Sequence, residues 1–247
     1  MPFVGTIINF FAIVVFSLLG SIVKCGIPER VNRAVLSAVA VCAVYLGIDG
    51  AMAPSDGYLD TLFSNTFLTK FVIMIISLCL GTAVGEFIDL DKLINHVGEK
   101  LEAAFVKKDE CGRGNFAQGI INCTLITCVG AMSVNGAILD AAGDPGILIA
   151  KSVMDAITCF IMASSLGAGC AFAALPMLVY QGGITALTLL LSSFIPEASI
   201  YYLSATGSLL ILLLGTNILG ATHVKTVNML PSIFVPLILV PIFSLFY

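Results

Sequence analysis

A lysine and an aspartate lie four residues apart inside one long apolar stretch of this sequence. They are Lys151 and Asp155, within DPGILIAKSVMDAITCF, which spans residues 144–160. Residues four apart share a face of an α-helix, so the two charges can offset each other. Charged groups inside a bilayer are costly, and they usually serve a substrate, a proton or an ion. The structural alternatives are a neutralised pair that only locks helices together, or a lysine that reaches outward to the headgroups.

The place of Asp155 along this stretch predicts that its carboxylate lies deep in the membrane. Asp144 followed by Pro145 is typical of a helix start. At about 1.5 Å per residue, Lys151 then lies about 9 Å and Asp155 about 15 Å into the helix. Because the hydrocarbon core is about 30 Å thick, Asp155 is expected near the midplane.

A second segment, residues 116–140, is unusually rich in small and polar residues. Gly130, Ser133, Asn135 and Gly136 make it a poor lipid-facing helix. Small residues allow close helix packing, and broken helices offer backbone groups to ligands. We expect either a discontinuous or re-entrant element that lines a cavity, or a tightly packed interior helix.

Several amides also fall inside apolar stretches. Intramembrane amides often do no more than hydrogen-bond between helices, so structural roles come first for each of them. Gln181, Asn122 and Asn217 are secondary candidates for contacts with a ligand. Asn122 also starts a glycosylation sequon, which is incidental inside a membrane. Further intramembrane polar residues of lower interest are Asn9, Glu86 and Asn228.

The composition defines the elements that must position these residues. The chain is 59% hydrophobic and only 11% charged, whereas soluble domains are about 25% charged. Because this number of charges is too small to cover a water-facing surface, most of the surface must face lipid. Backbone groups in lipid must be paired internally, and apolar stretches of about twenty residues fit membrane-crossing helices. We expect an all-α, polytopic transmembrane bundle that forms a single membrane domain over residues 1–247.

The hydrophobic stretches predict about eight spans, or seven if the fourth segment is re-entrant. Residues 1–87 would form a first half with three spans, and residues 145–247 a second half. The expected spans are Phe3–Val23, Ala34–Met52, Phe71–Phe87, Phe116–Leu139, Pro145–Cys170, Leu175–Ser193, Tyr202–Gly220 and Leu230–Phe246.

The charges predict an orientation with both termini outside. In an eight-span arrangement nine of the eleven basic residues fall on one side, which is then cytoplasmic. Lys70 and Lys151 are the exceptions. The cytoplasmic set is Lys24, Arg30, Arg33, Lys92, Lys100, Lys107, Lys108, Arg113 and Lys225. The opposite loops would carry Asp56, Asp60, Asp140, Asp144 and Glu197.

The segment 88–114 between the third and fourth spans has a helical apolar periodicity. From Asp89 to Arg113 the apolar residues recur at three- and four-residue spacing. We expect an amphipathic helix on the cytoplasmic interface, with a solvated linker helix as the alternative.

The two halves also suggest an internal repeat. A Leu-Gly pair, a proline and a Leu-Gly-Thr triplet occur in the same order in each half, starting at Leu19 and at Leu166. Transporters often contain such repeats, with the substrate site at their interface. The alternative is chance, since Leu-Gly pairs are common in apolar sequence.

Several function classes are disfavoured by what the sequence lacks. It contains no HExxH, GxSxG or P-loop motif, so we expect neither an enzyme nor ATP-driven pumping by this chain alone. The eight cysteines include no CxxC pair, and most lie in apolar segments, so no disulfide framework and no metal site is expected. We expect no cofactor and, without a basic patch, no nucleic-acid partner.

Six stretches of the chain carry a resemblance to a known family. They are VGTIINFFAIVVFSLLG (Val4–Gly20), LGTAVGE (Leu80–Glu86), CVGAM (Cys128–Met132), LIAKSVMDAIT (Leu148–Thr158), SSLGAGCAFAALPMLVYQG (Ser164–Gly182) and VNMLP (Val227–Pro231). With these stretches the sequence resembles, over essentially its whole length, the bacterial family called domain of unknown function 554. The resemblance implies a small polytopic protein of the bacterial cytoplasmic membrane, often suspected of transport, and it draws attention to Lys151, Ser152, Asp155 and Gln181.

The leading hypothesis is a secondary transporter of a small polar or ionic solute. The Lys151–Asp155 pair would exchange a proton, a cation or the substrate, and Ser133, Asn135 and Gln181 would line the cavity. One alternative is a passive channel built as an oligomer from the same polar helices. Another is a membrane scaffold or sensor subunit that acts through the segment 88–114. Faces of small residues also make a homodimer plausible.

Overall fold

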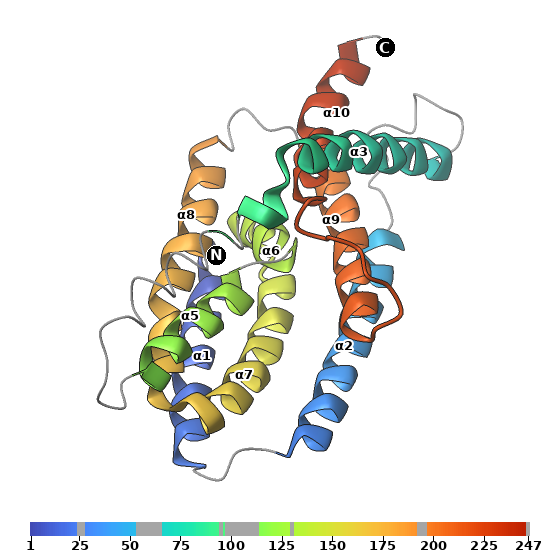
Figure 1. The fold of residues 1–247 in the computed structure, drawn as a ribbon. Helices are drawn as coiled ribbons and strands as arrows, with labels where there is room; N and C mark the ends of the chain where they lie inside the picture. Colours follow the sequence, from blue (N-terminus) through green and yellow to red (C-terminus); the bar gives the residue numbers. More distant parts are fainter. Residues whose placement is uncertain are drawn as a thin grey trace. The chain divides into compact units, whose positions relative to one another are not determined.

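The computed structural model describes residues 1–23, 28–52, 66–93, 96, 114–128, 131–191 and 197–245. All regular structure within these ranges is helical, so the predicted all-α class is confirmed for them (Figure 1). The chain forms two compact units. Unit 1 comprises Met1–Val39 and Lys92–Thr188, and unit 2 comprises Ala40–Asp91 and Leu189–Tyr247.

Two parallel helices, α1 and α7, form the centre of unit 1. Gly5 near the start of α1 faces Leu148 near the start of α7, and Gly20 near its end faces Phe160. A Cβ atom on Gly20 would lie 2.2 Å from the carbonyl oxygen of Phe160, so only glycine permits this approach. The helices of unit 1 are α1 (Val4–Ile22), the first part of α2 (Glu29–Met52), α5 (Gly114–Cys128), α6 (Ala131–Ala141), α7 (Gly146–Leu166), η1 (Gly167–Ala173) and α8 (Ala174–Leu191).

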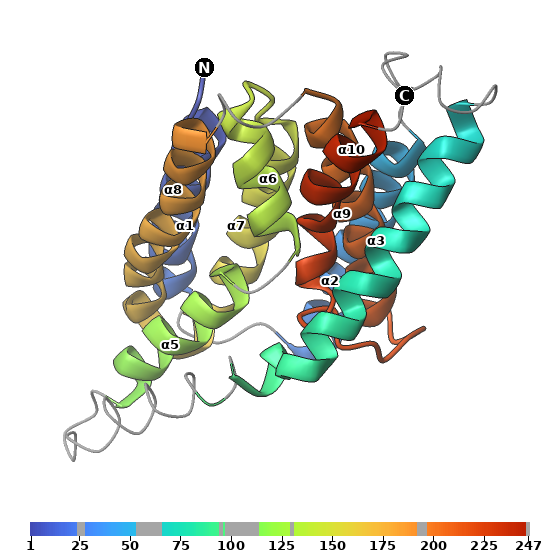
Figure 2. The same ribbon diagram turned by 90° about the horizontal axis from the view of Figure 1, so that it is seen from above.

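The run from α7 to α8 is a helical hairpin. As a straight helix its 46 residues would extend about 69 Å, more than twice the ~30 Å hydrocarbon core. The chain instead reverses at η1, after Gly167, whose φ of 80° suits glycine. Thr185 late in α8 therefore bonds to Ala137 of α6, which also faces the start of α7. Figure 2 shows α1 beside α8 in this unit.

The segment 116–140 contains a bend between α5 and α6. The axes of Gln118–Cys128 and Met132–Ala141 differ by 64°. Gly119 of α5 packs against Cys170 in η1, at one end of unit 1. Asp140 at the end of α6 bonds to the first turn of α1, at the other end. The pair α5–α6 thus connects the two ends of the unit.

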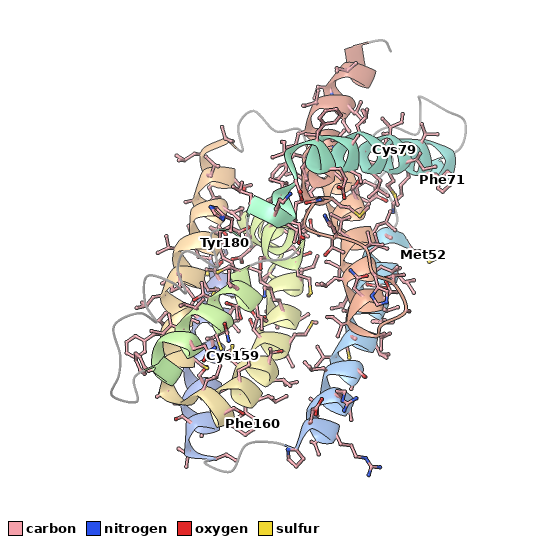
Figure 3. All side chains as sticks on the ribbon, in the orientation of Figure 1. Met52, Phe71, Cys79, Cys159, Phe160 and Tyr180 are labelled. Atoms are coloured by element: carbon pink, nitrogen blue, oxygen red, sulfur yellow. The ribbon has the colours of Figure 1, made fainter. Side chains whose placement is uncertain are left out.

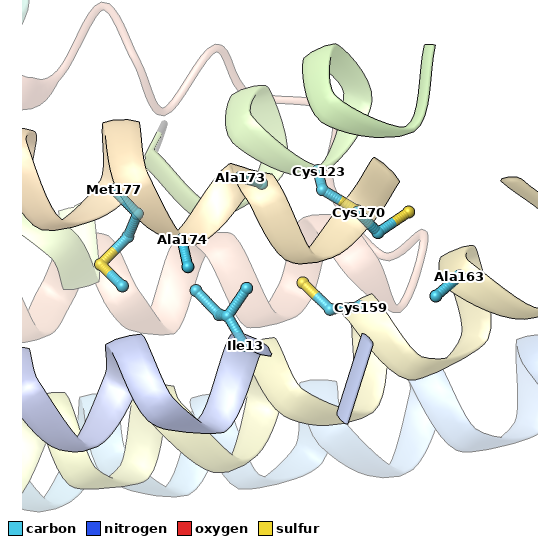
Figure 4. Packing of buried hydrophobic residues seen from close by; sticks show 8 residues of the cluster. All are labelled: Ile13, Cys123, Cys159, Ala163, Cys170, Ala173, Ala174 and Met177. Carbon is cyan, nitrogen blue, oxygen red and sulfur yellow. The ribbon is translucent and has the colours of Figure 1, made fainter. Parts of the chain in front are cut away.

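The core of unit 1 is rich in sulfur. The thiol of Cys123 lies 3.8 Å from the thioether of Met162, and Cys159 and Cys170 are also fully buried and free. These thiols pack as small apolar groups, as expected. The cluster in Figure 4 comprises Ile13, Cys123, Cys159, Ala163, Cys170, Ala173, Ala174 and Met177.

Unit 2 has close helix contacts of its own. Gly85 of α3 approaches the carbonyl oxygen of Asn228, and Gly47 of α2 approaches the backbone of Leu212. Lys70 is buried, and its ammonium lies 4.8 Å from the centre of the Tyr201 ring. The helices of unit 2 are the rest of α2, α3 (Thr66–Ile88), α9 (Glu197–Ile218), η3 (Leu230–Ile233) and α10 (Val235–Leu245).

The outer faces of the helices are apolar. Met52 is 77% exposed and Phe71 is 50% exposed (Figure 3), as expected of surfaces that face lipid. Five helices in the described ranges are long and apolar enough to cross a membrane, or six if the bent pair is one span. That count takes the hairpin α7–α8 as one helix, so the number of about eight spans stays a prediction. The predicted interfacial helix over 88–114 lies mostly outside the described residues.

Candidate functional site

The predicted ion pair forms in the middle of α7. The ammonium Nζ of Lys151 donates to both carboxylate oxygens of Asp155, at 2.7 and 2.6 Å. The two side chains are only 7% and 8% exposed. Asp155 lies about 13 Å along the helix at ~1.5 Å per residue, close to the middle of the 21 residues of α7.

Amides from two further helices complete the site. The Nδ2 of Asn9 on α1 donates to Asp155 Oδ2 at 3.1 Å and to Gln181 Oε1 on α8 at 3.2 Å. It also lies 3.7 Å from the thioether of Met177. Asn9 and Gln181 are both fully buried. We call Asn9, Lys151, Asp155 and Gln181 the central polar cluster.

The cluster has hydrogen-bonding capacity that the described part of the protein does not use. Asn9 Oδ1 and Gln181 Nε2 are buried, and neither has a hydrogen-bond partner within the described ranges. Leaving a buried polar atom unpaired costs about 1–3 kcal/mol, so such atoms in a native fold call for an explanation. Together they offer one amide oxygen as an acceptor and one amide NH2 group as a donor.

The helix α1 presents its amide because its small and polar face is turned inward. Its buried residues include Thr6, Asn9 and Ser17, whereas Ile7 and Phe11 are exposed. In water this pattern would be reversed. In a bilayer, large apolar side chains lose nothing by facing lipid, and small ones allow close packing.

Asp140 corrects one expectation from the sequence. The sequence predicts it in the outer loop after the fourth span, but it lies in the last turn of α6 and is fully buried. Its carboxylate accepts bonds from the backbone N–H groups of Gly5 and Thr6 and from the Thr6 hydroxyl, at 3.0–3.2 Å. The first turn of α1 has unpaired N–H groups and a partial positive charge, and this carboxylate satisfies both.

Ser152, Ser133 and Asn135 are buried in unit 1, and none is bonded to the central polar cluster. Ser152 donates to the carbonyl of Leu148 on its own helix at 2.7 Å. Ser133 donates to the carbonyl of Thr127 at 3.0 Å and so bridges the bend between α5 and α6. Both polar side-chain atoms of Asn135 are buried and have no hydrogen-bond partner among the described residues.

Asn122 and Asn217 lie elsewhere. Asn122 is half-buried on α5. Asn217 belongs to unit 2, where its Nδ2 donates to the Val224 carbonyl at 2.6 Å and its Oδ1 accepts from Thr222 and Val224. These contacts give Asn217 a local role in the turn after α9.

The comparisons with known proteins identify the family. The profile of the family described as Protein of unknown function (DUF554) matches residues 4–241. This chain belongs to the DUF554 family. The match includes every residue of the central polar cluster.

Two relatives of this DUF554 protein are both named as uncharacterised, and one of them is named as a membrane protein. The chain is 31% identical to the uncharacterised membrane protein YdfK of Bacillus subtilis, over 94% of this chain and 93% of the relative. It is 27% identical to the uncharacterised protein YqgA of Escherichia coli, over 93% of each. No solved structure is significantly similar to it. With its own long apolar helices, the chain is a helical membrane protein of this family.

A separate cavity in unit 1 of this DUF554 protein is wholly apolar. It has a volume of about 350 Å³ and lies among α1, α2 and α7. None of its lining residues belongs to the central polar cluster. They are Phe16, Leu19, Val31, Val35, Ile157, Phe160 and Ile161.

Proposed function

We propose that this protein is a secondary transporter of a small polar or ionic solute across the bacterial cytoplasmic membrane. The observation that carries the proposal is the central polar cluster. It joins a buried ion pair on α7 to amides of α1 and α8 that keep unpaired hydrogen-bonding atoms. Charged residues at this depth usually serve substrates, protons or ions.

The closed geometry of the pair favours a carrier over an open pore. The bonds from Lys151 Nζ to both oxygens of Asp155 keep the two charges together, and a solute must separate or replace them. Exchange of partners at one internal site is what a carrier requires, whereas a channel needs a continuous polar path.

The packing of unit 1 supports eight crossings with both termini outside. If α1, α2 and α3 each cross, the chain is inside after α3. Because α7 runs parallel to α1, the pair α5–α6 must then bring the chain back outside. Its contacts with η1 at one end and with α1 at the other agree with a full, broken crossing.

Reconstitution tests this proposal. Proteoliposomes are given a panel of radiolabelled small solutes: carboxylates, amino acids and monovalent ions. At least one should show saturable uptake by the unaltered protein, and Asp155→Asn and Lys151→Met should each abolish it. Thr158→Val is the matched control, because the Thr158 hydroxyl donates to the Met154 carbonyl of its own helix and not to the central polar cluster.

Two results would count against a carrier. Uptake that rises linearly with concentration would indicate a channel. Saturable uptake that survives Asp155→Asn in a folded protein would remove the central polar cluster from the transport path.

A further inference from the structure

We infer that the transported solute is a small singly charged oxyanion, a carboxylate in the simplest case, and that one proton enters with it on Asp155. Lys151 would bind the anion. This inference rests on the proposed function and adds the chemical class of its substrate. Four features of the central polar cluster carry it: charge balance, amide geometry, donor supply and the neutrality of its surroundings.

The first feature is charge balance. The cluster contains one ammonium, one carboxylate and two neutral amides, so its net charge is zero. An unpaired charge in a buried site carries a large free-energy cost. An anion that displaces Asp155 from Lys151 would leave the carboxylate unpaired unless that carboxylate takes up a proton. Anion and proton together keep the site neutral.

The second feature is the amide geometry. Asn9 Nδ2 now donates to Asp155 Oδ2 and to Gln181 Oε1, which suits an ionised carboxylate. The atoms left unpaired are Asn9 Oδ1 and Gln181 Nε2. A proton on Asp155 Oδ1 would leave Oδ2 able to accept from Asn9 Nδ2, and the Gln181 NH2 group would stay available to a ligand. The present arrangement of the amides therefore suits both protonation states of Asp155.

The third feature is the supply of donors. In the present arrangement the Gln181 NH2 group is free, and the Lys151 ammonium has three N–H groups, of which the bonds to Asp155 use two. A ligand that fits this set needs acceptor oxygens more than donors. Carboxylates and other small oxyanions present two or more such oxygens in one plane.

The fourth feature is that, among the residues that the structure describes, the surroundings add no further permanent charge at Asp155. On α7 its charged neighbour is Lys151, and α1 and α8 present Asn9, Gln181 and the Met177 thioether. On α5 the Cys128 thiol lies within electrostatic range of both charges. The carboxylate of α6, Asp140, is bonded instead to the first turn of α1.

The proton balance of the step is simple. A proton from water on the open side adds to a carboxylate oxygen of Asp155, and the Lys151–Asp155 ion pair opens. Lys151 keeps its charge and pairs with the incoming anion. On the other side the anion leaves, Asp155 releases its proton and the original ion pair re-forms. The only covalent change is this proton transfer, in which an O–H bond of the aqueous donor breaks as the O–H bond of Asp155 forms, and the reverse on the other side.

Binding to the full-length protein in lipid nanodiscs tests the inference without any flux assay. The probes are formate, acetate, lactate and nitrate, with acetamide as the neutral control. Titration calorimetry in buffers of different ionisation enthalpy counts protons taken up per ligand. We expect about one proton per anion between pH 6 and 8, and an apparent affinity that rises about tenfold for each unit of pH lowered. Nitrate is decisive, because it carries no proton of its own.

Two variants sharpen the result. Asp155→Asn should bind acetate and nitrate without proton uptake and without pH dependence, because its amide imitates the protonated acid. Gln181→Leu should weaken both anions at least tenfold while proton uptake per bound anion stays near one. If Asp155→Asn fails to fold, nitrate-linked proton uptake by the unaltered protein still decides the question.

Three outcomes would overturn the inference: no binding of any of the four anions, binding without proton uptake, or acetamide binding as well as acetate. These outcomes are separable from a failure of the proposed function. If the panel instead reveals saturable uptake of a cation or a neutral solute that depends on Asp155, the protein is a carrier and only the oxyanion assignment is wrong.

Discussion

At the scale of single residues, the ion pair of Lys151 and Asp155 is costly to bury and more costly to break. Removing one partner of a buried pair costs about 3–5 kcal/mol, because the other charge is left uncompensated. Replacing both partners by neutral groups of similar size is often tolerated. Stability and transport should therefore respond differently to single and double changes.

We expect Lys151→Met and Asp155→Asn each to lower the free energy of unfolding by about 3 kcal/mol or more. The double variant should recover most of this loss but not the transport activity. Chemical unfolding in detergent micelles, analysed as a double-mutant cycle, measures the coupling. Simple addition of the two losses would show that the pair is not formed in the membrane protein.

The same residues show what the sequence could and could not predict about the site. Spacing alone brought Lys151 and Asp155 together, because residues four apart meet on any helix. The sequence alone gives Asn9 a low rank as a site residue, because local spacing does not reveal that it meets Asp155 of α7, 146 positions away. Asp140 was misplaced for a similar reason, because its partners belong to the first turn of the chain.

At the scale of elements, glycine decides how closely α1 and α7 approach. Gly20 places its backbone against Phe160, whereas a Cβ added to Gly183 on α8 would meet nothing within 4 Å. The two glycines allow a matched comparison in one unit. Gly20 is also paired with Gly167 in the suggested internal repeat. Gly167 instead adopts a positive φ at a turn, so the two positions have different physical roles.

We expect Gly20→Ala to lower the free energy of unfolding by about 1–3 kcal/mol, because the helices must move apart. Gly183→Ala should be neutral or should stabilise the protein by up to about 1 kcal/mol, since alanine favours helix more than glycine. Thermal unfolding of both variants in the same detergent makes the comparison. Equal effects would mean that α1 and α7 do not cross at Gly20.

The sequence predicts where the long helices lie better than it predicts where a helix is interrupted. Long apolar stretches predicted α1 within one residue and α2, α3 and α9 within five residues at each end, because a bilayer sets their length. The small and polar residues of 116–140 indicated an irregular element. Whether such an element re-enters or crosses depends on what its two ends contact, and those partners lie in η1 and α1.

At the scale of the whole molecule, eight crossings and seven crossings place the C-terminus on opposite sides. We expect the C-terminus to lie outside. Alkaline phosphatase fused after Tyr247 should be active, and green fluorescent protein fused there should be dark. Fusions within 94–113 should show the reverse pattern. A fluorescent C-terminal fusion would contradict eight crossings and favour a re-entrant fourth segment.

The contact of Asp140 with the first turn of α1 has a consequence for the order of events during synthesis. Gly5, Thr6 and Asn9 find partners 134 to 172 positions later in the chain. At roughly 5–20 residues per second, the ribosome needs roughly 7 to 35 seconds to supply them. During that interval the polar face of the first helix lacks these partners. An insertase or neighbouring lipid headgroups would then have to contact that face. We therefore expect a nascent chain arrested before Asp140 emerges to be cleaved by protease faster than chains arrested later in synthesis.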